Sequence, residues 1–145
     1  MISIALGMDP DQRYIVQDKM STKMAMRITQ KCRDSSARPF ATAHDVLMEG
    51  YLGQLIEKGE DEIEIFGAYE NLCIASLVRY AIELDINITV PKRHIVRSKN
   101  NAHGLIRSLE EMNKKGFKIV PFQHTQDSEN YFIRFSNELP TSYLF

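Results

Sequence analysis

The sequence has few cysteines, no long apolar run and almost no net charge, and each shortage excludes a class of protein. Only two cysteines, Cys32 and Cys73, occur in 145 residues, which excludes a disulfide framework and favours a reducing compartment. No segment reaches the length of a transmembrane helix, and the N-terminal residues lack the basic region of a signal peptide. We therefore expect a cytoplasmic protein with no membrane partner.

The charge and the histidines narrow the expected ligands. A formal net charge of −1 gives no electrostatic reason to expect binding of nucleic acid. The four histidines, at positions 44, 94, 103 and 124, do not follow the spacing of metal ligands. We therefore expect neither a metal nor another cofactor.

Apolar segments of strand and helix length alternate along the chain. Short β-type runs are expected at residues 2–6, 63–66, 86–90, 117–122 and 131–135, and the last of these has the alternation of an edge strand or of a hairpin strand. Helical periodicity follows Asp9-Pro10 up to Cys32 and recurs over residues 43–58, 73–84 and 102–115, whereas residues 33–41 have the composition of a flexible segment. The alternation predicts one domain, residues 1–145, with a three-layer α/β/α fold and a mainly parallel sheet.

The segment around Cys73 is the most informative part of the chain. A strand-like run stops at Gly67, small and polar residues follow, and Cys73 opens an apolar helix. The partial positive charge and unpaired N–H groups at a helix start favour a thiolate and an oxyanion. The alternative is that Cys73 is a buried apolar residue packed between helix and sheet.

The residues from about 46 to 120 resemble the isochorismatase-like cysteine hydrolases, which include the nicotinamidases. That family carries a motif of the form G-x-x-T-x-x-C-V with a following Ala. Gly67, Cys73, Ile74 and Ala81 stand at matching positions, whereas Asn71 lies one residue past the Thr position, which Glu70 occupies. The resemblance implies an α/β fold and hydrolysis of an amide or related C–N bond of a small molecule.

The resemblance also implies roles for individual residues. Cys73 is the expected nucleophile, Asp9 or Asp11 the base, and backbone N–H groups at Asn71 and Leu72 the oxyanion or substrate contacts. The family takes its cation from a lysine, but no lysine lies between Lys31 and Lys58, so Arg38 is the nearest candidate.

Two alternatives remain open at this point. The absent lysine favours a catalytically degenerate protein that binds a ligand or takes part in protein assembly. A metal-dependent nuclease of the PIN-like type would use Asp9, Glu70 and Asp85, although Glu70 and Asp85 should lie at opposite ends of one helix.

Two further segments suggest partners. Residues 91–104 form the most basic stretch and could receive an anionic substrate, although exposed Lys and Arg are common in loops. The chain ends in Tyr143, Leu144 and Phe145, apolar side chains that would be covered in an interface. We therefore expect a homo-oligomer, an expectation that the family resemblance shares.

Overall fold

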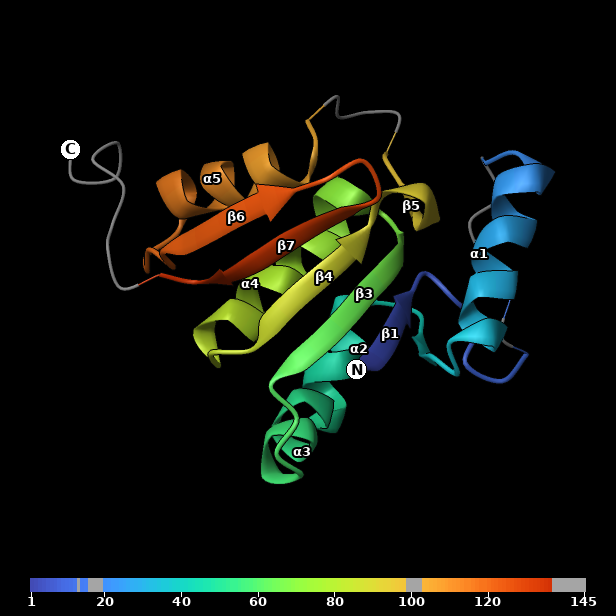
Figure 1. Cartoon of the computed structure of the whole chain (residues 1–145), viewed down its shortest axis with the longest axis horizontal. Coiled ribbons are helices and arrows are strands. Elements are labelled where there is room, and N and C mark those ends of the chain that lie inside the picture. The colour runs from blue at the N-terminus through green and yellow to red at the C-terminus, as the bar shows by residue number, and fades with distance from the viewer. Residues whose placement is uncertain (13, 16–19, 99–102, 137–145) are drawn as a thin grey trace.

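A seven-stranded mixed sheet organises the chain, which a computed structural model describes at residues 1–12, 14–15, 20–98 and 103–136 (Figure 1). The strand order is β2-β1-β3-β4-β7-β6. The short strand β5 lies outside this order and pairs with the last two residues of β3, Gly67 and Ala68. The strands are β1 (Ile2–Leu6), β2 (Arg38–Phe40), β3 (Glu62–Ala68), β4 (Asn87–Pro91), β5 (Ile95–Val96), β6 (Phe122–Gln126) and β7 (Asn130–Phe135). The predicted α/β class is confirmed.

The sheet is parallel in one half and antiparallel in the other. Strands β1 to β5 pair in parallel, whereas β7 runs antiparallel to both β4 and β6, so the predicted mainly parallel sheet is only partly matched. The cause is a hairpin turn in which the Asp127 carboxylate accepts the backbone N–H groups of Glu129 and Asn130. Of the two predictions for residues 131–135, the hairpin strand is confirmed and the edge strand is wrong, because β7 pairs with both β4 and β6 and leaves β6 at the edge.

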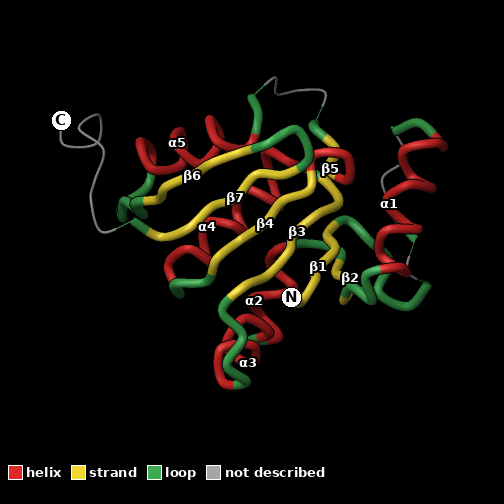
Figure 2. Tube along the Cα trace, in the orientation of Figure 1, coloured by secondary structure: helices red, strands yellow, loops and turns green. Residues whose placement is uncertain are grey.

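The helices flank this sheet (Figure 2). They are α1 (Thr22–Asp34), α2 (Ala43–Glu49), α3 (Tyr51–Glu57), α4 (Ala75–Glu83) and α5 (Leu105–Lys115), and the short turns η1 (Glu70–Ile74) and η2 (Lys92–His94) follow β3 and β4. In Figure 1, α4 and α5 lie behind the sheet and α1 stands beside its β1 end. The single helix predicted over residues 43–58 is divided at Gly50, whose left-handed φ of 70° ends α2.

The N-terminal third differs most from the sequence-based expectation. Asp9-Pro10 does not begin a helix, because the Asp9 carboxylate accepts the N–H groups of Asp11 and Gln12 and closes a turn. Helix α1 begins after Ser21, whose side chain accepts the N–H of Met24 at 3.2 Å. The segment predicted to be flexible contains β2, which pairs in parallel with β1.

The described apolar residues form one core, centred on β1, β3, β4 and the inner face of α4. Among the described residues, no helix combines the length and apolar character needed to cross a membrane. Residues 143–145 lie outside the described part of the chain, so their role in a homo-oligomer stays a prediction.

Candidate functional site

Cys73 lies in η1, a π-helical turn between β3 and α4 at the carboxyl end of β3. The predicted order of strand, turn, cysteine and helix is therefore present. Cys73 is half-buried and packs against the apolar core, and the peptide bond between Ala68 and Tyr69, just upstream, is cis. Ligands bind preferentially at this edge in parallel α/β sheets, so the position suits a site.

The residues predicted to hold an oxyanion or substrate have other partners. The N–H of Leu72 donates to the carbonyl of Tyr69 at 3.1 Å, and the Leu72 side chain is exposed. The buried Asn71 side chain accepts the N–H of Ser98 through Oδ1 at 3.0 Å. Asn71 thus ties η1 to the segment that follows β5, and the Leu72 N–H is already used within the turn.

The predicted base lies in a turn of its own. The Asp9 carboxylate accepts the backbone N–H of Asp11 at 2.8 Å and the backbone N–H of Gln12 at 2.9 Å, and both donors belong to the turn that follows it. Asp11 is exposed and supplies only its backbone N–H to this turn. Within the described ranges, neither carboxylate has a hydrogen bond with Cys73.

The predicted cation, Arg38, is also engaged elsewhere. Its guanidinium pairs with Glu49 and lies 5.0 Å from the Phe40 ring centroid and 4.7 Å from that of Tyr51. In the strand register Arg38 stands opposite Ile4, before β1 reaches its carboxyl end. Over the part of the chain that is described, no hydrogen bond or ion pair joins Cys73, Asp9 and Arg38 to one another.

Glu70 is a buried acid that couples η1 to α5. Its Oε2 accepts the N–H of Leu105, the first residue of α5, at 2.8 Å, and its Oε1 lies 3.4 Å from Nε of Arg97. A carboxylate at a helix N-terminus satisfies an otherwise unpaired N–H and complements the helix dipole. Glu70 does not join Asp9 and Asp85 in a metal cluster, since the described residues contain no group of three or more potential acidic, histidine or cysteine ligands.

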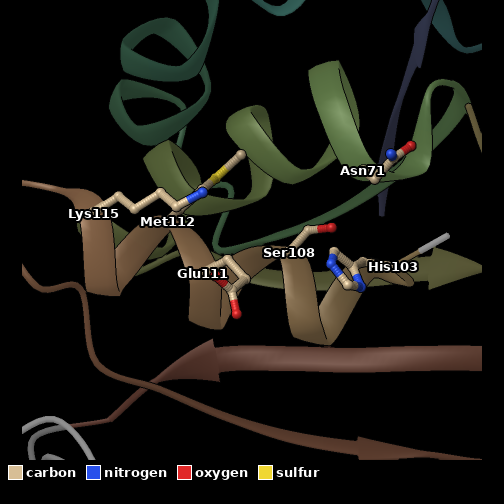
Figure 3. A pocket seen from close by; sticks show the side chains of 6 residues that line it. All are labelled: Asn71, His103, Ser108, Glu111, Met112 and Lys115. Carbon is tan, nitrogen blue, oxygen red and sulfur yellow. The ribbon is translucent and has the colours of Figure 1, made fainter. Parts of the chain in front are cut away.

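A polar pocket of about 340 Å³ lies between η1 and α5 (Figure 3). Its lining residues are Asn71, His103, Ser108, Glu111, Met112 and Lys115. Ser108 donates its hydroxyl to the carbonyl of Gly104 at 2.9 Å, which leaves its oxygen able to accept a further hydrogen bond. One ammonium, one carboxylate, an imidazole and a hydroxyl around a cavity of this size suit a small polar molecule.

A second polar cluster, on β3 and α1, was not predicted from the sequence. Buried Glu64 accepts the hydroxyl of Ser3 at 2.8 Å and pairs with Lys31 at 3.0 Å. The signal that could have identified it is its place between Ile63 and Ile65, inside a strand whose two faces are both covered.

No family model, curated protein or solved structure matches this chain. The resemblance to the isochorismatase-like hydrolases therefore depends on the quoted sequence positions alone.

Proposed function

We propose that this protein is a non-hydrolytic relative of the isochorismatase-like proteins and binds a small polar molecule in the η1–α5 pocket. In this proposal the fold is a variant of the three-layer, Rossmann-like α/β/α arrangement of that family. The observation that carries the proposal is the engagement of the expected catalytic partners elsewhere: Asp9 closes its own turn and Arg38 pairs with Glu49. A cysteine needs a nearby base to act as an efficient nucleophile.

The pocket supports the binding half of the proposal. Asn71 and Ser108 are held in fixed positions by their hydrogen bonds, so part of the lining is preorganised. Glu111 and Lys115 lie one turn apart on α5 and offer opposite charges to a ligand. A small amide or carboxylate, the ligand class that the family resemblance implies, matches these groups.

The hydrolytic half is tested by measuring ammonia released from nicotinamide and from a panel of primary amides. We expect the wild-type protein and Cys73→Ala to release ammonia at the same background rate. Release that depends on Cys73 would overturn the non-hydrolytic assignment.

The binding half is tested by adding nicotinamide and nicotinate to isotope-labelled protein and following the backbone NMR signals. We expect shifts at Asn71 and Ser108 and weaker binding in Lys115→Gln, with Lys118→Gln as the exposed control outside the pocket. If no small amide or carboxylate shifts the pocket signals, the binding assignment is wrong.

A cysteine hydrolase is the second candidate, favoured by the partial exposure of Cys73 at the carboxyl edge of β3. Alkylation by iodoacetamide as a function of pH distinguishes the two candidates. A catalytic Cys73 reacts well below the ordinary thiol pKa of about 8.5, whereas a structural thiol reacts slowly until the protein unfolds. Cys73→Ala identifies the labelling that belongs to this residue rather than to Cys32.

A further inference from the structure

Helix α1 and the turn η2 bring basic side chains together beside the carboxyl end of β4. Arg27 and Lys31 are one helical turn apart on α1, and α1 packs against η2, which carries Arg93 and His94. These elements are distant in sequence, so the cluster is a product of the fold. We call these four residues the α1–η2 basic cluster.

Only part of the positive charge in this cluster is balanced. Lys31 pairs with Glu64 at 3.0 Å, and its ammonium lies 5.6 Å from the centroid of the Phe66 ring. Within the described ranges, Arg27 and Arg93 form neither an ion pair nor a hydrogen bond with another residue. Two guanidinium groups therefore remain available to an external anion.

His94 adds an unsatisfied polar atom to the same place. Its ring meets the Phe66 ring edge-on with centroids 6.4 Å apart, so His94 and Lys31 flank one aromatic side chain. Nδ1 of His94 is shielded from solvent and has no hydrogen-bond partner among the described residues. Burial, and then the nearby charge of Lys31, lowers the pKa of His94; the Glu64 carboxylate acts in the opposite direction, and Arg27 and Arg93 lower the pKa further. The imidazole therefore lies near three cations and one carboxylate.

We propose that the α1–η2 basic cluster binds a phosphate or carboxylate group of a small molecule. Arginine presents a planar fork of donors that matches either anion in two-point contact, and Arg27 and Arg93 supply two such forks from different elements. The cluster lies where β4 ends, at the edge at which open α/β sheets bind ligands. This site is separate from the η1–α5 pocket and does not depend on the proposed function.

Calorimetric titration with inorganic phosphate, at constant ionic strength maintained with chloride, tests the proposal. We expect saturable binding of one phosphate at millimolar concentration, and about tenfold weaker binding in Arg27→Gln and in Arg93→Gln. Arg107→Gln removes an exposed arginine from α5 and should bind as the wild type does. The same titration with acetate distinguishes a carboxylate site from one that requires phosphate.

Two results would overturn the proposal. One is the absence of saturable binding of either anion, and the other is equal binding by the wild type and by the Arg27→Gln/Arg93→Gln double variant. The imidazole ¹⁵N signals of His94 give an independent measurement, because a bound anion should shift them in the wild type. Binding that leaves these signals unchanged would place the anion elsewhere.

Discussion

Glu64 and Glu70 are both buried acids, one inside β3 and one just beyond its end, but different groups compensate their charges. Glu64 has a lysine partner at 3.0 Å and a serine hydroxyl at 2.8 Å. Glu70 has a backbone N–H at 2.8 Å, at the start of α5, and a longer 3.4 Å contact with Arg97, whose side chain is 47% exposed. Glu64 depends on a side-chain cation, whereas Glu70 depends mainly on a helix terminus.

The difference shows what the two buried glutamates do. Through Lys31, Glu64 fixes α1, which carries part of the α1–η2 basic cluster. Through the N–H of Leu105, Glu70 fixes α5, which lines the η1–α5 pocket. Each buried glutamate therefore positions one candidate site, and neither forms a hydrogen bond with the Cys73 thiol in the described part of the chain.

The largest effect is expected from removing the cation beside Glu64. Lys31→Met leaves that carboxylate buried and unpaired, and should lower the free energy of unfolding by about 2–3 kcal/mol, somewhat less than for a fully buried pair because Lys31 is partly exposed. Urea denaturation at neutral pH measures this loss. Lys23→Met, an exposed change on the same helix, should leave the stability within about 0.5 kcal/mol.

The double variant Lys31→Met/Glu64→Gln sharpens the same test. It removes both charges and keeps an acceptor for Ser3, so it should be more stable than Lys31→Met alone. A double variant that is less stable than the single variant would show that the unpaired charge is not the cause of the loss.

A smaller loss is expected at Glu70. Glu70→Ala leaves the N–H of Leu105 without its acceptor and should cost about 1–2 kcal/mol, whereas Glu70→Gln retains an acceptor and should cost less. Arg97→Gln should cost below about 0.5 kcal/mol, because its contact with Glu70 is long and partly exposed. Urea denaturation and hydrogen exchange of the Leu105 amide follow these changes. A greater loss in Arg97→Gln than in Glu70→Ala would reverse the comparison of the two glutamates.

The free energy of unfolding should depend on pH through His94, which lies close to Glu64. Burial and neighbouring cations lower its pKa in the folded state, so the unfolded chain binds the proton more readily. The contribution of His94 to stability is therefore complete above the unfolded value of about 6.5 and is lost as pH falls through the lower, folded pKa. In phosphate-free buffer, His94→Gln should lose less stability than the wild type between neutral and mildly acidic pH. An unchanged or steeper loss would contradict this sign.

The fold was predictable from the sequence where local signals agreed with tertiary contacts. Strands β1 and β4 and the turn before α4 follow from apolar runs and breaking residues. The pairing of β7 between β4 and β6 is a long-range choice that no local pattern determines, and the short strand β2 is stabilised by its neighbour β1. Gly50 was part of an apparently continuous helical pattern, although it ends one helix and precedes the next.

The candidate site was less predictable, because its chemistry depends on which polar groups meet in space. The sequence identified Cys73 and the edge on which it lies, but it gave no indication that Arg38 would pair with Glu49 or that Glu70 would cap α5. The α1–η2 basic cluster joins residues from distant parts of the chain, and only its Arg93 and His94 belong to a run that the sequence marks as basic.

A small effect on stability is expected at Cys73 itself. Its side chain is half-buried, so Cys73→Ala should cost below about 1 kcal/mol in urea denaturation. Cys32→Ala is the matched comparison, because that sulfur is fully buried on α1 and lies 3.8 Å from the carbonyl oxygen of Ala37. We expect Cys32→Ala to cost about 1–2 kcal/mol, since it leaves a cavity in the core. Equal losses would mean that Cys73 contributes to packing as much as Cys32 does. A thiol that contributes little to stability is free of that structural role, so its reactivity alone would then decide between a ligand-binding site and a nucleophile.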